Sequence, residues 1–92
     1  MAQINIQRSH RLEAQQLRDL SEQMAHSLQT RYQLDWYWRG EQLHFERSGA
    51  KGVLTAAADS LNITLKLGLF YRPLAAQIQR AIEDKLDEML SL

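Results

Sequence analysis

The feature that most constrains the fold is the alternation of apolar and polar residues between Leu34 and Leu67. A period of two is typical of strands with one buried face, and the alternating runs fall at 34–39, 43–46, 53–57 and 61–67. Short turns separate them, at Arg39-Gly40-Glu41, Ser48 to Gly52, and Ala58-Asp59-Ser60. Because a parallel crossover needs about a dozen residues, these turns predict an antiparallel meander.

The segments on either side of the meander add one strand and two helices. Alternation at 3–7 predicts a first strand, and Ser9 is a candidate N-cap for an amphipathic helix over 11–31. Pro73 suits the first turn of a second helix, whose apolar stripe consists of Leu74, Ile78, Ile82, Leu86 and Met89. Because every element is apolar on one side only, we expect one α+β domain over 1–92. Its order would be βαββββα, with two helices packed on one face of an antiparallel sheet.

Composition and charge exclude several classes of protein. The chain has no cysteine, which excludes a disulfide framework, a thiolate metal site and a cysteine nucleophile. Lys and Arg number 11, as do Asp and Glu, so the net charge favours neither nucleic acid nor an anionic membrane as a partner. No stretch has the length and apolarity of a signal peptide or a transmembrane segment. We therefore expect a cytoplasmic protein.

The residues that could carry chemistry form no catalytic or metal-binding pattern. His10, His26 and His44 lack the i, i+4 spacing of a zinc motif, so we expect solvated or locally hydrogen-bonded histidines and no metal or other cofactor. His44 and Glu46 share the polar side of one strand. We interpret this side as a solvated face, with an acid–base pair as the alternative. We likewise interpret a group of C-terminal acids as solvated, with contact to a basic partner as the alternative: Glu83, Asp84, Asp87 and Glu88. We therefore predict that the chain is not an enzyme.

Two tryptophans and the apolar strand positions define the predicted core. Trp36 and Trp38, with arginines nearby, are compatible with a base-stacking platform. Both share the parity of Leu34, which places them on the core side, so we expect no binding of nucleic acid. The residues that line the core, or a ligand cavity within it, are predicted to be Trp36, Trp38, Phe45, Ile63, Leu65, Ile78 and Ile82. The glycines at 40, 49, 52 and 68 are interpreted as turn glycines, because none lies in a phosphate-binding loop.

Several motifs in a fixed order resemble a known family. They are Ile4-Asn5-Ile6, His10 before Leu12, the segment from Phe45 to Gly52, and Leu67-Gly68-Leu69 followed by Pro73. Over nearly the whole chain they resemble the polyhydroxyalkanoic acid system proteins, small bacterial proteins encoded near polyhydroxyalkanoate granule genes. The resemblance implies a cytoplasmic, granule-associated accessory protein that binds a protein partner or the surface of a storage-polyester granule. It brings no established catalytic residues.

The predicted order of elements also resembles a shortened helix-grip fold, as in START and Bet v 1-like lipid-binding proteins. This resemblance implies an alternative function, the binding of a small apolar ligand such as an acyl or hydroxyacyl group. In the helix-grip order the first strand pairs with the last, which leaves 34–39 at an edge without a proline or lysine to block pairing. We expect a homodimer joined along this edge through Asp35, Tyr37 and Arg39. The alternative is a monomer in which Asp35 and Arg39 shield the edge.

Overall fold

The computed structural model describes residues 2–90, which form a five-stranded sheet and two α-helices. In chain order the elements are β1 (Ala2–Ser9), α1 (Ala14–Tyr32), β2 (Asp35–Arg39), β3 (Gln42–Arg47), β4 (Ala50–Ala56), β5 (Ser60–Leu67), the 3-10 turn η1 (Arg72–Leu74) and α2 (Ala75–Leu90). All neighbouring strands are antiparallel, in the order β1-β5-β4-β3-β2. The predicted α+β fold and its element order are confirmed.

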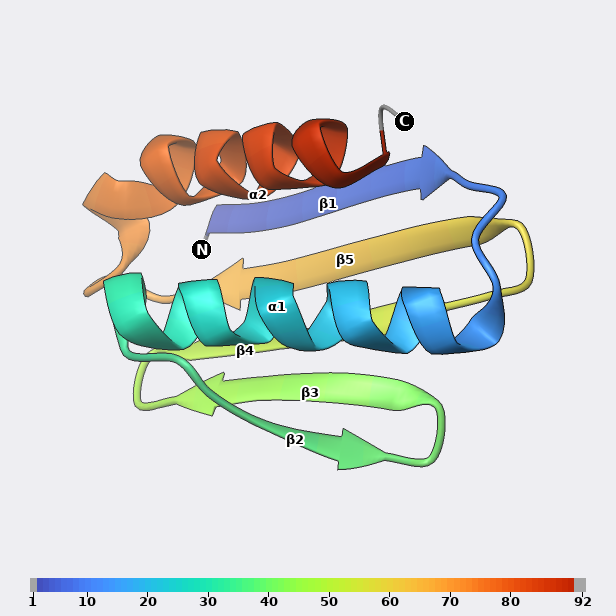
Figure 1. Cartoon of the computed structure of the whole chain (residues 1–92). Helices are drawn as coiled ribbons and strands as arrows, with labels where there is room; N and C mark the ends of the chain where they lie inside the picture. Colours follow the sequence, from blue (N-terminus) through green and yellow to red (C-terminus); the bar gives the residue numbers. More distant parts are fainter. Residues whose placement is uncertain (1, 91–92) are drawn as a thin grey trace.

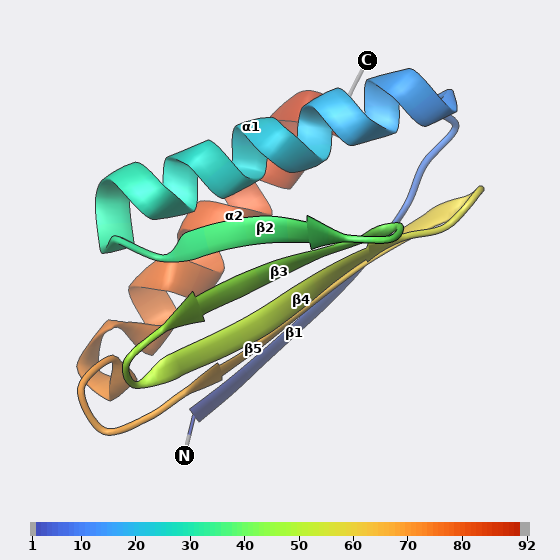
Figure 2. The ribbon, with the colours of Figure 1, turned by 90° about the horizontal axis from the view of Figure 1, so that it is seen from below.

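Both helices lie on the same face of the sheet. In Figure 1, α2 runs along β1, and α1 lies in front of β4 and β5. Figure 2 shows that the opposite face of the sheet is left uncovered. This two-layer arrangement explains the alternation in the sequence, because each strand has one side toward the helices and the other toward solvent.

The covered face of the sheet is built from rows of apolar side chains that run across the strands. Two such rows, read from the register of the strand pairs, are Leu43, Leu54, Ile63 and Ile6, and Phe45, Gly52, Leu65 and Ile4. Met24 and Leu28 of α1 and Ile78 and Ile82 of α2 are buried with them in one core cluster. Burial stabilises the layers by about 25 cal/mol per Å² of apolar surface, so this cluster holds the helices on the sheet.

The predicted start of the first helix at residue 11, with Ser9 as its N-cap, is wrong. Ser9 is the last residue of β1 and pairs with Ser60. The N-cap is Glu13, whose backbone N–H donates to Oε1 of Gln16 at 3.0 Å. The periodic pattern of the helix extends into residues that the tertiary structure holds in an extended conformation, and the helix therefore begins at Ala14.

His10 holds the segment between β1 and α1 extended. Its Nδ1 accepts a hydrogen bond from the Leu12 N–H at 3.1 Å, and its Nε2 lies 2.9 Å from the carbonyl oxygen of Ala57. The His10 backbone N–H donates to the carbonyl of Asp59 at 3.0 Å. The side chain is 8% exposed and joins the start of α1 to the turn between β4 and β5. His10 is thus locally hydrogen-bonded, as the sequence predicted.

β4 begins at Ala50, earlier than the predicted start at residue 53. The turn that precedes it contains only Ser48 and Gly49, and Gly49 has a φ of +89°, which favours glycine. The start of β4 has no apolar signal in the sequence, because Ala50 has a small side chain and the residue that faces the core next along the strand is a glycine.

Gly52 is therefore a strand residue, and its interpretation as a turn glycine is wrong. It lies opposite Phe45 on one side and Leu65 on the other. A Cβ at this position would clash with the side chain of Leu65 and would lie 2.6 Å from the carbonyl oxygen of Thr64. Leu65 occupies the space above the backbone, so glycine lets the neighbouring strand fill the core.

The tryptophans lie on the covered face, but they are half-buried rather than enclosed. Nε1 of Trp36 donates to Oε1 of Gln29 at 3.0 Å, and Nε1 of Trp38 donates to Oε2 of Glu22 at 2.8 Å. Each indole therefore connects β2 to α1 at the margin of the core. The remaining residues of the predicted core set are 0–1% exposed: Phe45, Ile63, Leu65, Ile78 and Ile82.

Candidate functional site

Two turns that are distant in the sequence meet at one end of the sheet. The backbone N–H of Gly68 donates to the carbonyl oxygen of Gly49 at 2.7 Å. A Cβ on Gly68 would lie 3.1 Å from that same oxygen, so the contact favours a residue without a side chain. We call Ser48, Gly49 and Gly68 the glycine junction. The sequence predicted both turns but not their contact, because residues 49 and 68 are brought together only by the pairing of β4 with β5.

The chain leaves the glycine junction through a tightly hydrogen-bonded turn. The Gly68 carbonyl accepts from the N–H groups of Tyr71 at 3.1 Å and Arg72 at 3.0 Å. The Tyr71 hydroxyl donates to the carbonyl of Tyr32 at the end of α1, at 2.9 Å. The turn is therefore fixed to the sheet on one side and to α1 on the other.

Two large apolar side chains protrude from this turn. Leu69 is 84% exposed and Phe70 is 91% exposed. We call this pair the apolar tip. This pair was not among the predicted functional residues, although the sequence contains a signal for it: two large apolar residues stand together between a strand and a helix, outside the period of either element.

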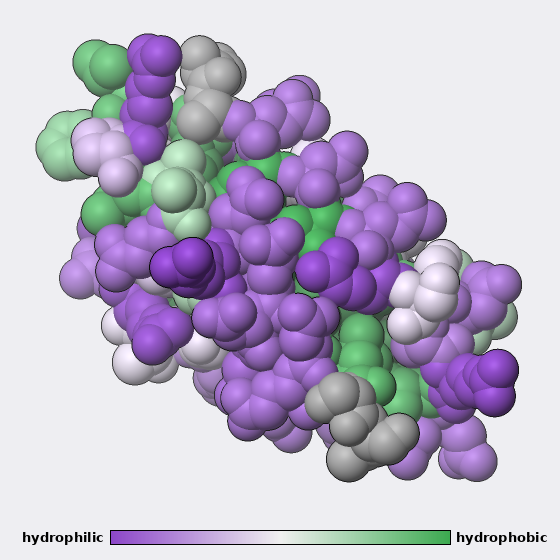
Figure 3. Space-filling model, turned by 90° about the horizontal axis from the view of Figure 1, so that it is seen from above, coloured by the Kyte–Doolittle hydropathy of each residue, from purple (hydrophilic) through white to green (hydrophobic). Residues whose placement is uncertain are grey.

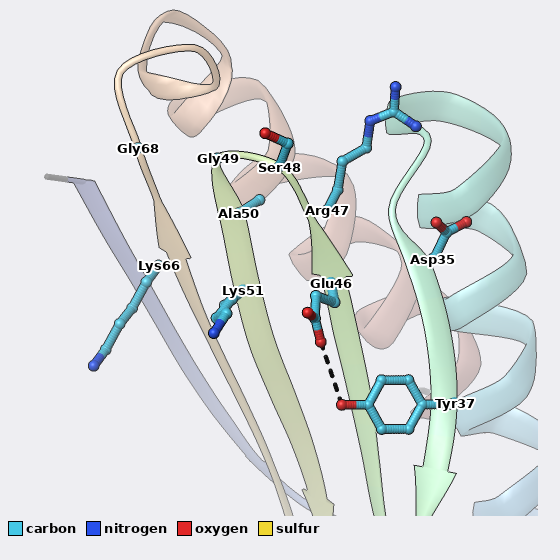
Figure 4. Close-up of a pocket in the computed structure, with 10 residues that line it drawn as sticks. All are labelled: Asp35, Tyr37, Glu46, Arg47, Ser48, Gly49, Ala50, Lys51, Lys66 and Gly68. Atoms are coloured by element: carbon cyan, nitrogen blue, oxygen red, sulfur yellow. Dashed lines mark hydrogen bonds between the residues drawn. The ribbon is translucent and has the colours of Figure 1, made fainter.

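Cationic side chains lie on the surface near the apolar tip. Arg31, Arg47 and Phe70 help to line one shallow depression of about 500 Å³. A second depression, of about 770 Å³, adjoins it on the uncovered face of the sheet and includes Lys51 and Lys66 (Figure 4). Within residues 2–90, the ion pairs that the structure forms join Arg8 to Glu83 and to Asp87. The cations around the tip are thus exposed without a carboxylate partner of this kind.

The larger depression also contains the carboxylates of Asp35 and Glu46. Glu46 accepts a hydrogen bond from the Tyr37 hydroxyl at 3.3 Å, and Figure 4 shows this pair beside the cationic side chains. Arg47 is directed away from Glu46, and its Nη1 donates to the carbonyl of Gln33 at 3.4 Å. The surface is therefore open and combines carboxylates with cations.

Comparison with known proteins identifies the family. The family model described as "Putative polyhydroxyalkanoic acid system protein" matches residues 4–90. The chain belongs to this family. The match confirms the resemblance found in the sequence and connects the chain to the polyhydroxyalkanoate system, and it assigns no residue a role.

One solved structure shares the fold of this family member. The NMR structure of PA4090 from Pseudomonas aeruginosa aligns with a TM-score of 0.63 at 16% identity, over 100% of this chain and 88% of the other. At that identity the likeness concerns the fold alone. Among proteins of curated function, none matches the chain.

The predicted polar face of the family member is formed as expected, but its histidine is not paired with Glu46. The His44 ring stacks on Tyr37, with ring centres 5.4 Å apart and planes 10° from parallel. Its Nε2 is buried and has no hydrogen-bond partner among the described residues.

In the part of the chain that the structure describes, no group of three or more potential metal ligands comes together. No helix in this part is long and apolar enough to cross a membrane.

The first strand pairs with the last and β2 is an edge strand, as predicted, whereas the resemblance to helix-grip proteins themselves is not confirmed by the solved structure that shares the fold. Asp35, Tyr37 and Arg39 alternate with the tryptophans and are exposed on the uncovered side, where Tyr37 is 44% exposed. Homodimer formation through this edge stays a prediction. Of the three residues, Asp35 and Tyr37 also line the depression beside the glycine junction.

Proposed function

We propose that this family member is a non-enzymatic accessory protein of the polyhydroxyalkanoate system that acts by binding the granule surface or a granule protein. The observation that carries the proposal is the apolar tip, which the hydrogen bonds of the glycine junction hold away from the body of the protein. Exposed apolar side chains on a fixed turn are a binding feature. Family membership supplies the context of the storage polyester.

The shape of the surface supports binding rather than catalysis. The depressions beside the tip are open, and their polar groups lie on the uncovered sheet face or at its end. Glu46 is hydrogen-bonded to Tyr37 rather than to His44. A cytoplasmic protein associated with granules would use such a face for reversible contact.

Fractionation of a polyester-accumulating host tests the proposal. Tagged protein is expected to sediment with granules, and mass spectrometry of the captured material should identify granule proteins if the contact is with protein. The same tag on an unrelated protein of similar size serves as the control. A protein that stays fully soluble and captures no granule protein would overturn the proposal.

The binding of an acyl or hydroxyacyl ligand, as in helix-grip proteins, is a second candidate function. It is favoured by a groove of about 560 Å³ between the start of α1 and the sheet, lined by Leu12, Leu17, Trp38 and Ala56 among others. The space between the sheet and α2, where helix-grip proteins enclose ligand, is instead occupied by Ile78 and Ile82. Titration with acyl ligands should change the fluorescence of Trp38, and W38F should abolish the change. An unchanged spectrum at millimolar ligand would remove this candidate.

A further inference from the structure

Charge is distributed unevenly along the molecule although its sum is zero. Around the glycine junction cations outnumber carboxylates. The cations are Arg31, Arg47, Lys51, Lys66 and Arg72, and the carboxylates are those of Asp35 and Glu46. The opposite end of the sheet, with its turns between β2 and β3 and between β4 and β5, carries both signs without an excess of cations: Arg11 and Arg39 with Glu13, Glu41 and Asp59. The apolar tip therefore lies at the cationic end.

Apolar surface gathers at the same end. Figure 3 shows green atoms at the left of the molecule, the end at which Figure 1 places the connection from β5 to α2. Leu74 of η1 is 37% exposed and extends the apolar surface formed by Leu69 and Phe70. Single exposed apolar residues are ordinary, but an adjacent pair that protrudes among arginines combines the two features of a peripheral lipid contact.

We propose that the apolar tip docks on an anionic phospholipid surface. Leu69 and Phe70 enter the boundary between headgroups and acyl chains, while Arg47 and Arg72 bind lipid phosphates. This inference rests on the proposed function, because it names the surface that the accessory protein contacts. Phospholipid is favoured over bare polyester because polyester is built from neutral ester groups, whereas phosphate matches the geometry of the guanidinium group.

Sedimentation with vesicles of phosphatidylcholine, with and without phosphatidylglycerol, tests the proposal. Wild-type protein is expected to bind the phosphatidylglycerol vesicles, and binding should weaken as salt is added. L69S/F70S should bind at least about 100-fold more weakly, because two large side chains no longer leave water. R47Q/R72Q should lose about 25-fold, at roughly five-fold for each cation near the surface.

Matched variants separate this docking mode from general effects. R11Q removes an exposed arginine outside both the cationic end and the β2 edge, and it should bind as the wild type does. F70W reports insertion directly, since its emission should shift to the blue on vesicles that contain phosphatidylglycerol. All these side chains are exposed, so the melting temperatures of the variants should stay close to that of the wild type.

Several results would overturn the proposal. They are equal binding to both kinds of vesicle, a loss in R11Q as large as that in R47Q/R72Q, or no vesicle binding at all. Binding to polyester particles but not to vesicles would assign the tip to the polymer instead, and concentration-dependent self-association through the tip would assign it to a second copy. If the protein sediments with granules in the host but ignores vesicles, this inference fails while the proposed function stands.

Discussion

Replacement of Gly52 by alanine tests the placement of β4 directly. Gly52 lies between Phe45 and Leu65 on the face that the helices cover. An added Cβ would clash with the side chain of Leu65 and lie 2.6 Å from the carbonyl oxygen of Thr64. The side chain could move at some cost to the packing of the core, but the carbonyl belongs to the backbone of a paired strand. The substitution therefore overpacks the centre of the sheet.

The magnitude follows from two opposing terms. Overpacking of a close-packed core costs about 1–3 kcal/mol. Alanine restricts the unfolded chain more than glycine does, which returns about 0.4–1 kcal/mol. We expect a net loss of about 1–2 kcal/mol in the free energy of unfolding, which corresponds to roughly 5–15 °C in melting temperature for a domain of this size.

Thermal and urea unfolding followed by circular dichroism would measure the loss in G52A. The same substitution in an L65V background should cost at least about 1 kcal/mol less, because the δ-methyl group that it meets is gone. G40A serves as the control: a Cβ there has nothing within 4 Å, and its cost comes only from the φ of +62°. G40A should therefore cost the same in both backgrounds. If G52A were as stable as the wild type, or showed no coupling to residue 65, residue 52 would not face Leu65.

The remaining predictions concern the core, the buried histidine and the free edge. F45A should lose about 3–5 kcal/mol of unfolding free energy and H44A well under 1 kcal/mol, and equal losses would refute the assigned faces. H10A should lose about 2 kcal/mol in urea unfolding, because it removes both side-chain hydrogen bonds of a buried residue; an unchanged midpoint would refute that role. Light scattering at about 50 µM should give a dimer mass that Y37K reduces to 10.7 kDa, whereas a monomeric wild type would exclude the dimer.

The strands and their order could be predicted because two-residue periodicity has a simple cause. Each strand has one face toward the helices, so large apolar residues such as Leu61 and Ile63 alternate with polar ones. β4 fails this rule at Gly52, where a neighbour's side chain fills the core position. Sequence periodicity indicates which side chains of a strand are buried. It gives no signal at a position where a side chain of another strand fills the core.

The predicted site and the observed one differ for a related reason. His44 and Glu46 were identified because they share a strand face, and local parity is visible in a sequence. The glycine junction joins Gly49 to Gly68 through a tertiary hydrogen bond that no local pattern encodes. The motifs behind the family resemblance do contain both glycines, so the sequence marked the two segments without revealing that they meet.

The net charge, likewise, does not show how the charged residues are arranged on the surface. The longest axis of the molecule measures 37 Å, and the Debye length in physiological salt is about 8 Å. A partner at the cationic end is therefore screened from the carboxylates at the other end, and it meets Arg47 and Arg72 much as it would on a basic protein. Zero net charge removes the long-range attraction that a net charge would exert, but it leaves short-range attraction intact. A contact of this kind should be sensitive to salt and should orient the protein with its apolar tip toward an anionic surface.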